Sequence, residues 1–256
     1  MTDSPFDLKD KVAIVTGGGT GIGRGIAIEF ARAGADVVVA SRKLENLEKV
    51  AAEIGDLGRR ALAIATDVRK PEDVDNMVQK TMEQFGRIDI LVNNAGASFR
   101  CPLEDMSPGG WDAVVGIDLK GVFLCSRAAG KVMIQQKKGK IINISSIAGV
   151  YGSPMMVHYG AAKAGVINFT TSLASEWAKH NINVNCIAPG PIITEGYQGV
   201  RTAGGLSDLP PGSNALNRWG RPEEIAYAAI FLASEASSFV TGETICVDGG
   251  RPAREE

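Results

Sequence analysis

VAIVTGGGTGIGRGIAIEF, residues 12–30, places a short β-branched run, a glycine-rich turn and a helix-forming segment one after another. The turn Thr16–Gly23 lacks most Cβ atoms, so backbone N–H groups and the start of the following helix can approach a bound anion closely. Its glycines depart from the G-x-G-x-x-G spacing, and a glycine-rich loop by itself is often only a tight turn. The position directly after a first strand favours a nucleotide pyrophosphate as the partner of this turn.

Short β-branched runs alternate with longer amphipathic stretches along the rest of the chain. That alternation is typical of a parallel sheet covered on both faces by helices. No linker rich in proline or serine divides the chain and no fixed repeat appears, so we predict one α/β domain over residues 1–256. Seven strands are expected in one open sheet, at Val12–Thr16, Asp36–Ser41, Ala61–Thr66, Ile88–Asn93, Lys140–Ser145, Asn183–Ala188 and Thr244–Val247.

One long segment, Ile192–Arg221, shows no clear period and is rich in glycine and proline. Loops of this length inside a compact domain are usually binding loops or lids. We therefore predict that residues 192–221 form a substrate loop or lid.

The composition excludes several classes of protein. The 256 residues carry a net charge of −2, with 45% hydrophobic and 22% charged residues, as in a soluble globular protein. No basic run extends beyond Lys137–Lys140, so we expect neither a nucleic-acid partner nor a membrane partner. The acidic amino terminus lacks the regions of a signal peptide, which predicts a cytoplasmic protein. The four cysteines lack the paired spacing of a zinc site, so no metal is expected.

The end of the second strand indicates which dinucleotide is preferred. Folds that prefer NAD place an acidic side chain here to hold the ribose hydroxyls, and that carboxylate repels a 2′-phosphate. This chain instead has Ser41 and Arg42, a neutral hydroxyl and a guanidinium suited to phosphate. We therefore predict NADP(H) as the cofactor. The alternative is that Arg42 and Lys43 are a solvated pair at a helix start.

Polar residues follow the third and fourth strands. Asp67-Val68 and Asn93–Gly96 stand at the carboxyl ends of these strands, where open α/β sheets bind their ligands. Either segment could be only a turn, because Asx side chains often satisfy their own backbone. A buried asparagine pair could also simply tie neighbouring strands together.

Tyr159 and Lys163 stand four residues apart at the start of an apolar helical stretch. Side chains at i and i+4 share one helix face, so the ammonium can favour the ionised form of the phenol. A free phenol titrates near ~10, and a nearby cation is one of the few ways to make it a usable acid or base. Chance also produces such pairs, so the interpretation requires a pocket, a cofactor and a third polar partner. For the preceding His158 we expect a packing or surface role.

These segments together resemble the short-chain dehydrogenase/reductase family over nearly the whole chain. The matching motifs are TGxxxGxG at Thr16–Gly23, NNAG at Asn93–Gly96, PG at Pro189-Gly190, and the Ser and YxxxK site at Ser146, Tyr159 and Lys163. The resemblance implies a single Rossmann-like, doubly wound domain and NAD(P)-dependent hydride transfer. It also implies a homo-oligomer, usually a tetramer.

The resemblance assigns roles to the catalytic residues. Tyr159 would be the general acid when a carbonyl is reduced and the base when an alcohol is oxidised. Lys163 would lower the pKa of the tyrosine and hold the nicotinamide ribose. Ser146 would donate a hydrogen bond to the substrate oxygen and stabilise developing negative charge, with Ser145 as the structural alternative.

Cofactor contacts carry over in the same way. Asp67 and Val68 would contact the adenine, and Asn94 the ribose region. Ile192 and Thr194 would contact the nicotinamide carboxamide. The full expected set is Gly17, Thr20, Gly21, Ile22, Gly23, Ser41, Arg42, Asp67, Val68, Asn94, Tyr159, Lys163, Pro189, Gly190, Ile192 and Thr194.

One position departs from the family, because Asp118 stands where asparagine is common. In the family this residue helps to hold a water that connects the lysine to solvent, largely through its backbone carbonyl. An aspartate here need not abolish that relay, and we expect it to be tolerated as a catalytic-site residue. Its carboxylate could stabilise the Lys163 ammonium, or it could bind local backbone at a helix kink.

The substrate pocket is expected between the 192–221 segment, Ala97–Leu103 and Val150–His158. Their apolar side chains suit an acyl chain or a hydrophobic ketone more than a sugar. We therefore predict NADPH-dependent reduction of a carbonyl to an alcohol, with 3-oxoacyl thioesters or hydrophobic ketones as substrates.

Two alternatives remain open. Ala40–Lys43, Pro189–Ile192 and Thr194–Gly196 also resemble the 2,4-dienoyl-CoA and trans-2-enoyl-CoA reductases. A nucleotide sensor that keeps the fold without turnover is the other alternative, although such proteins usually lose the tyrosine or the lysine.

Overall fold

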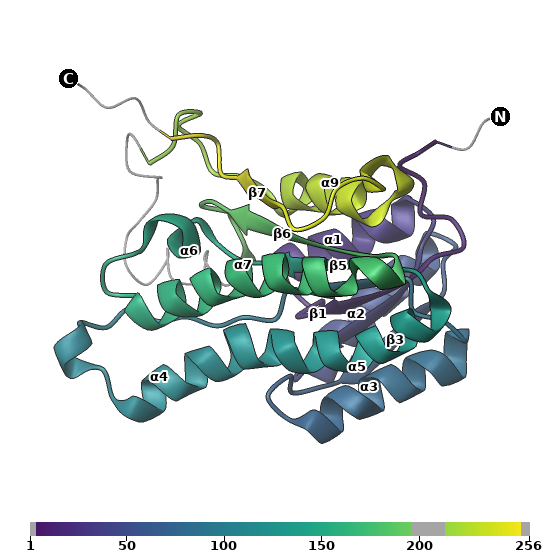
Figure 1. Ribbon diagram of the computed structural model, residues 1–256, viewed down its shortest axis with the longest axis horizontal. Helices are drawn as coiled ribbons and strands as arrows, with labels where there is room; N and C mark the ends of the chain where they lie inside the picture. The colour runs from purple at the N-terminus through teal and green to yellow at the C-terminus, as the bar shows by residue number, and fades with distance from the viewer. Residues whose placement is uncertain (1–3, 196–212, 252–256) are drawn as a thin grey trace.

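A computed structural model of the chain describes residues 4–195 and 213–251 (Figure 1). Its centre is one sheet of seven strands in the order β3-β2-β1-β4-β5-β6-β7, and every neighbouring pair is parallel. The predicted seven-stranded parallel sheet and Rossmann-like fold are therefore confirmed. The strands are β1 (Val12–Thr16), β2 (Asp36–Ser41), β3 (Ala61–Ala65), β4 (Ile90–Asn93), β5 (Gly139–Ile144), β6 (Ile182–Pro189) and β7 (Thr244–Val247).

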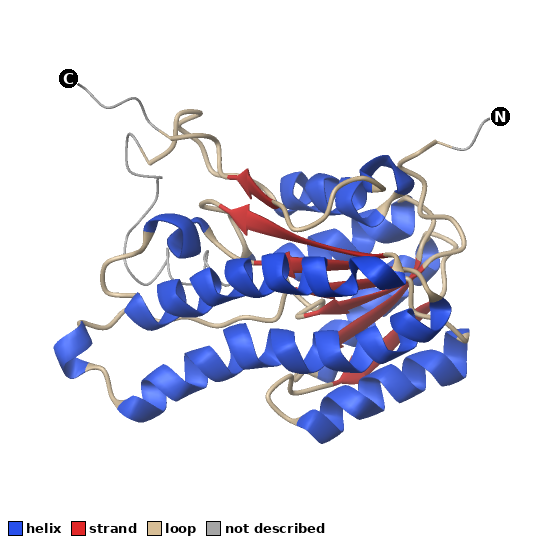
Figure 2. Cartoon of the chain, viewed as in Figure 1, coloured by secondary structure: helices blue, strands red, loops and turns tan. Residues whose placement is uncertain are grey.

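Helices cover both faces of the sheet (Figure 2). Side chains alternate between the faces of a strand, so Val15 and Val39 join one buried cluster while Ile14 and Val38 join the other. The first cluster includes residues of α1, α2 and α9, and the second includes residues of α3, α5 and α7. The helices are α1 (Gly21–Arg32), α2 (Leu44–Asp56), α3 (Pro71–Phe85), α4 (Pro108–Val115), α5 (Gly121–Gln136), α6 (Ile147–Tyr151), α7 (Val157–Trp177) and α9 (Pro222–Ala233).

The strand order reverses between β1 and β4. From β1 the chain adds β2 and β3 on one side, then returns to place β4 to β7 on the other side. The crevice at the carboxyl ends of strands at such a reversal is where open α/β sheets bind ligands. Figure 1 shows α6 and the start of α7 beyond the arrowhead of β6, at this same end of the sheet.

Most predicted strand ends are right to within one residue, and the start of β4 is the largest difference. The prediction began this strand at Ile88, whereas β4 begins at Ile90. The Ile88 N–H donates to the Gln136 side chain at 3.1 Å, and the Asp89 carboxylate accepts from the Val12 N–H at 2.9 Å. At Ile88 the Gln136 side chain therefore takes the place of a neighbouring strand, whereas the Asp89 backbone still bonds to Val12 and Lys140.

A π-helical turn, η2 (Gly116–Lys120), joins α4 to α5. This wider turn contains Asp118, which is fully buried although it is a carboxylate. Short 3₁₀ turns lie elsewhere, at η1 (Leu103–Asp105), η3 (Ala178–His180) and η4 (Glu235–Ser237). Within the described residues, no helix combines the length and the apolar character needed to cross a membrane.

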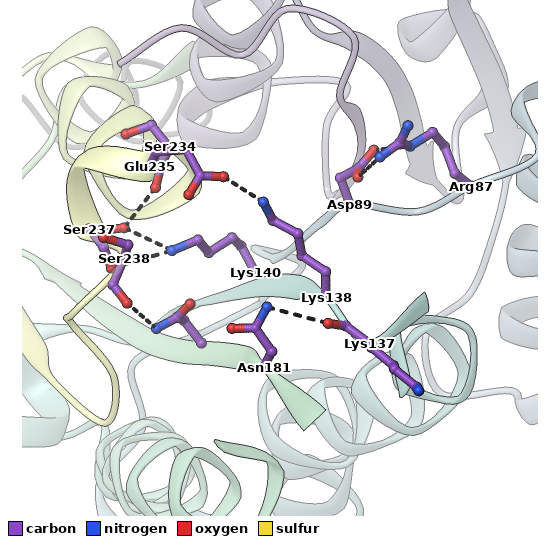
Figure 3. Close-up of polar contacts among 11 residues, drawn as sticks. Arg87, Asp89, Lys137, Lys138, Lys140, Asn181, Ser234, Glu235, Ser237 and Ser238 are labelled. Carbon is purple, nitrogen blue, oxygen red and sulfur yellow. Dashed lines mark hydrogen bonds and ion pairs between the residues drawn. The ribbon is translucent and has the colours of Figure 1, made fainter. Parts of the chain in front are cut away.

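Polar contacts fasten the amino-terminal end of β5 to η4, at the end of the sheet opposite the expected ligand crevice (Figure 3). The buried Lys140 ammonium donates to the Ser237 carbonyl at 3.3 Å, and Lys138 pairs with Glu235 at 2.7 Å. Burial lowers the pKa of Lys140, and the neighbouring Lys138 also lowers it, while Glu235 opposes this shift. We interpret these contacts as structural, because they hold η4 against the start of β5.

Candidate active site

The glycine-rich turn after β1 folds tightly onto the start of α1. The Gly17 N–H donates to the Ala40 carbonyl at 2.7 Å, which fixes the turn beside the end of β2. A Cβ atom on Gly23 would lie 2.2 Å from the Gly17 carbonyl oxygen and 2.4 Å from Asn94 Nδ2, so a larger residue cannot fit here. Thr20 precedes the helix without a side-chain cap, which leaves first-turn N–H groups to other partners.

Thr16 and Asn94 connect this turn to the end of β4. Thr16 Oγ1 accepts from the N–H groups of Asn94 at 3.0 Å and Ala95 at 3.1 Å. The Asn94 amide donates to the carbonyl oxygens of Thr16 at 3.0 Å and Gly17 at 3.3 Å. Asn94, which we predicted in the ribose region, thus ties the glycine-rich turn to the end of β4 in this structure. The side-chain role of Thr16 was missed, although the residue stood inside the quoted motif.

Asn93 takes the alternative role of a tie between strands. Its amide donates to Asn143 Oδ1 on β5 at 2.8 Å and to Ser126 Oγ on α5 at 2.9 Å. Asn143 in turn donates to Thr170 Oγ1 on α7 at 2.9 Å. This buried chain of hydrogen bonds sets α7 against β4 and β5, and it therefore positions the helix that carries Tyr159.

Two guanidinium groups stand near the carboxyl ends of β2 and β3. Arg42 is exposed and makes no hydrogen bond or ion pair with another described residue, and Ser41 beside it is half-buried. Arg69 donates from Nε to Asp67 Oδ1 at 2.9 Å. Hydrogen bonds from Arg69 lower the pKa of Asp67 to about 2 against the opposing effect of burial, and the charge of Arg42 adds to the lowering. Val68, the next residue, is buried against Gly121.

The structure distinguishes the two serines after β5. Ser145 is buried and its hydroxyl donates to the Lys163 carbonyl oxygen at 2.8 Å. Ser146 is half-buried and caps α6, where its Oγ accepts from the Ala148 N–H at 3.1 Å. Among the described residues Ser146 Oγ donates to no acceptor, so its proton is available to a ligand. The geometry thus favours Ser146 over Ser145 as the substrate contact.

Replacing each serine with alanine is expected to separate these roles. Ser146→Ala removes a donor to the reacting oxygen and is expected to lower kcat by about 10²-fold. It also removes the cap of α6, which is expected to cost about 1 kcal/mol of unfolding free energy. Ser145→Ala leaves the Lys163 carbonyl without its side-chain donor and is expected to cost about 1 kcal/mol of unfolding free energy. Steady-state kinetics and urea denaturation of both variants measure this. A larger loss of kcat in Ser145→Ala than in Ser146→Ala would contradict the assignment.

Tyr159 and Lys163 lie on the first turns of α7, as the spacing predicted. Tyr159 is half-buried, whereas Lys163 is buried, and the Lys163 ammonium lies 5.6 Å from the centroid of the Tyr159 ring. The same ammonium donates to the Ile144 carbonyl at the end of β5, at 2.9 Å. A helix and a strand end therefore fix the lysine head beside the phenol.

Asp118 is the second anchor of the lysine. Its Oδ1 lies 2.9 Å from Lys163 Nζ, and both side chains are almost fully excluded from solvent. Its Oδ2 accepts from the Ala97 N–H at 3.0 Å, so the carboxylate pairs with the ammonium and also holds the backbone of a distant segment in place of the local backbone. Burial lowers the pKa of Lys163, but the opposite charge of Asp118, helped by Tyr159, outweighs it and the net shift is upward. A Cβ on Gly96 would lie 2.7 Å from Asp118 Oδ1, so a glycine permits this approach.

The remaining expected residues cluster after β6. The Gly190 N–H donates to the Val247 carbonyl at 3.0 Å, directly after Pro189. Ile192 pairs with Gly220, which joins the two ends of the predicted 192–221 loop. Thr194 lies against the glycine turn, with its Cγ2 atom 3.2 Å from the position of a Cβ on Gly21. Residues 196–212 of the loop lie outside the described residues, so its role as a lid stays a prediction.

His158 is fully buried, which agrees with the packing role expected for it. Its ring lies edge-on to Phe99, with 4.4 Å between the ring centroids. Neither ring nitrogen has a hydrogen-bond partner within the described residues. The packing places the Phe99 segment against the first turn of α7.

Comparisons with known proteins agree with this geometry. A family model described as enoyl-(acyl carrier protein) reductase matches residues 17–251. The chain is 43% identical to a peroxisomal 2,4-dienoyl-CoA reductase of Danio rerio, over 96% of this chain and 83% of that protein. It is 43% identical to a 2-dehydro-3-deoxy-D-gluconate 5-dehydrogenase of Escherichia coli, over 99% and 100% of the two chains. A 3-oxoacyl-[acyl-carrier-protein] reductase of Synechocystis is 42% identical, over 95% and 97%.

The fold and the site define a dinucleotide-binding oxidoreductase. The chain belongs to the short-chain dehydrogenase/reductase family, whose members are NAD(P)-dependent enzymes. The names of the relatives differ in their substrates, so membership alone leaves the substrate to be inferred from the site.

Proposed function

We propose that this enzyme uses NADPH to reduce a carbonyl, in a 3-oxoacyl thioester or a hydrophobic ketone, to an alcohol. One observation carries the proposal: Ser146 offers a hydroxyl proton at the end of β5, beside a helix that presents Tyr159 next to a buried ammonium. A hydroxyl donor and a phenol acid on neighbouring elements suit a carbonyl oxygen that gains negative charge and then a proton.

The residues present fit a dinucleotide. The turn after β1 folds this tightly only because Gly23 lacks a Cβ, and the start of α1, which the Thr20 side chain does not cap, suits a pyrophosphate. Arg42, exposed and without an ion pair in the described part of the chain, stands where a 2′-phosphate would neutralise it. When bound, the reduced nicotinamide supplies the hydride.

Each polar side chain of the site has a distinct task in this proposal. Ser146 orients the substrate oxygen, and Tyr159 gives it a proton. The Lys163 ammonium donates to the Ile144 carbonyl and forms an ion pair with Asp118. Its remaining N–H groups are available to the cofactor ribose and the phenol oxygen. Because Asp118 keeps the lysine protonated, a positive charge faces Tyr159 as the phenol loses its proton.

Replacing Arg42 tests the preference for NADP(H). In Arg42→Ala, kcat/KM with NADPH is expected to fall by about 10-fold or more, because a charge-assisted contact with the 2′-phosphate is lost. The value with NADH should change little. Lys43→Ala is the matched control, since it removes a neighbouring exposed charge. Equal or better efficiency of the unmodified enzyme with NADH would contradict the assignment.

The surroundings of the site support an apolar substrate. Phe99, Tyr151 and Met155 are large apolar side chains that stay well exposed near the first turn of α7. The Cys101 N–H donates to the Met155 carbonyl at 2.8 Å, which joins the two segments that we predicted as pocket walls. The 3-oxoacyl-[acyl-carrier-protein] reductase among the relatives agrees with such a substrate.

Reduction of a dienoyl-CoA or enoyl-CoA thioester is the second candidate. The Danio rerio relative at 43% identity favours it, together with the local resemblance at Ala40–Lys43. Retention of both Ser146 and Tyr159 favours the carbonyl reaction, whose reacting oxygen requires a donor and an acid.

A spectrophotometric screen separates the candidates. NADPH oxidation would be followed with acetoacetyl, enoyl and dienoyl thioesters, simple ketones and sugar acids. We expect the highest kcat/KM with the acetoacetyl thioester or a hydrophobic ketone. A preference for the enoyl or dienoyl thioesters would establish the second candidate, and a preference for the sugar acid would contradict both. Absence of any turnover would favour a nucleotide sensor.

Two further expectations belong to this proposal. We propose a homotetramer, as is usual in the family, and light scattering of the purified protein would distinguish it from a dimer. A cytoplasmic location is likewise a prediction, which fractionation of cells that express the protein would test.

A further inference from the structure

The carboxylate of Glu195 lies on the start of α1. Its Oε2 accepts a hydrogen bond from the Gly21 N–H at 2.9 Å, between residues 174 positions apart in the sequence. Gly21 is the first residue of α1, and Glu195 follows the end of β6 by six residues. The contact therefore joins the glycine turn to the beginning of the predicted 192–221 loop.

The Gly21 N–H is a position for an anion. Free N–H groups and the helix dipole make the first turn of a helix attractive to negative charge. Thr20 provides no side-chain cap, so Glu195 supplies the negative group that this turn lacks. Thr194 closes the same space, because its Cγ2 atom lies 3.2 Å from where a Cβ on Gly21 would stand.

We propose that Glu195 is an internal competitor for the pyrophosphate position of the cofactor, an inference that rests on the proposed dinucleotide site. A carboxylate and a pyrophosphate cannot share one N–H group, and their charges repel. Binding of the dinucleotide therefore exchanges one anion for the other and moves the Glu195 carboxylate away from the Gly21 N–H.

This exchange predicts how the affinity for the cofactor depends on the charge of Glu195. Part of the binding free energy of the cofactor is used to displace Glu195, so removing its charge should tighten binding. The effect should be confined to ligands that carry a pyrophosphate. A ligand that contacts only Arg42 should bind with unchanged affinity when Glu195 loses its charge, because such a ligand does not compete for the Gly21 N–H.

The experiment compares Glu195→Gln with the unmodified enzyme by isothermal titration calorimetry, using ADP and adenosine 2′-phosphate as probes. Glutamine keeps a neutral oxygen that can accept from Gly21, so the fold is preserved while the charge is lost. Glu176→Gln is the matched control, because Glu176 is exposed near the far end of α7 and the variant has the same net charge.

We expect ADP to bind about threefold or more tightly to Glu195→Gln, while the affinity for adenosine 2′-phosphate stays within about twofold. Glu176→Gln should change neither affinity. Unchanged ADP affinity, or equal tightening of both ligands, would overturn the proposal. Failure of the unmodified enzyme to bind ADP, adenosine 2′-phosphate or NADPH would instead remove the dinucleotide site, and the inference with it.

Discussion

Replacing Tyr159 with phenylalanine is expected to lower kcat by about 10²–10⁴-fold, the usual contribution of a positioned general acid. The hydroxyl is the only atom removed, and the buried Lys163 and its partners stay in place. Affinity for NADPH should therefore change little. Steady-state kinetics with the best substrate of the screen, together with calorimetric titration of NADPH, measure the two quantities separately.

Tyr227→Phe is the matched control. Tyr227 lies on α9 and is 56% exposed, so loss of its hydroxyl should leave kcat and stability unchanged. Full activity of Tyr159→Phe would show that another group protonates the product. A loss of activity accompanied by loss of NADPH binding would instead place the phenol in cofactor binding rather than in proton transfer.

Asp118→Ala is expected to lower the free energy of unfolding by about 3–5 kcal/mol, because it leaves the buried Lys163 charge without its partner. The variant also removes the acceptor of the Ala97 N–H. Urea denaturation at neutral pH measures the loss. Asp112→Ala is a suitable control, since Asp112 is an exposed residue of neighbouring α4.

Asp118→Asn refines this prediction. The amide keeps an oxygen that can accept from the Ala97 N–H, but it carries no negative charge to pair with the Lys163 ammonium. We expect a smaller loss of stability than with alanine and a kcat within about tenfold of the unmodified enzyme. An increase of kcat by an order of magnitude or more would show that aspartate impairs the site.

The pH dependence of the Asp118 effect has a definite sign. The pKa of Lys163 is raised from the ordinary value of 10.5, so the stability from the ion pair is fully present below that value. It is lost as the pH rises through the still higher pKa of the folded protein. The stability difference between the unmodified enzyme and Asp118→Asn should therefore be constant near neutral pH and narrow only in strongly alkaline solution.

Much of the fold follows from the sequence. The bounds of β1, β2 and β7 agree with the prediction residue by residue, because their apolar runs end at glycine, charged or polar residues. The predicted start of β4 was wrong because the Gln136 side chain, and not a neighbouring strand, bonds to the N–H and the carbonyl of Ile88. Local β propensity does not register partners contributed by distant segments.

Site contacts between segments that are distant in the sequence could not be predicted from the sequence. Spacing alone could not decide between Ser145 and Ser146, because the decisive contact is to the Lys163 carbonyl on another element. The double role of Asp118 likewise requires the approach of Gly96 and Ala97. The contact between Gly21 and Glu195 has no local signal, since it joins residues 174 positions apart.

The π-helical turn at Gly116–Lys120 has a consequence for how this enzyme could change over evolution. Such a turn holds one residue more than a regular helical turn, and each residue of an α-helix accounts for about 100° of rotation. Deleting a single residue here would turn α4 and α5 against each other and move the Asp118 carboxylate off its inward direction. The ion pair between Asp118 and Lys163 therefore depends on the number of residues in this turn as well as on the residue at position 118. An insertion or a deletion at this point would therefore change the charge beside the lysine, as a substitution of Asp118 does.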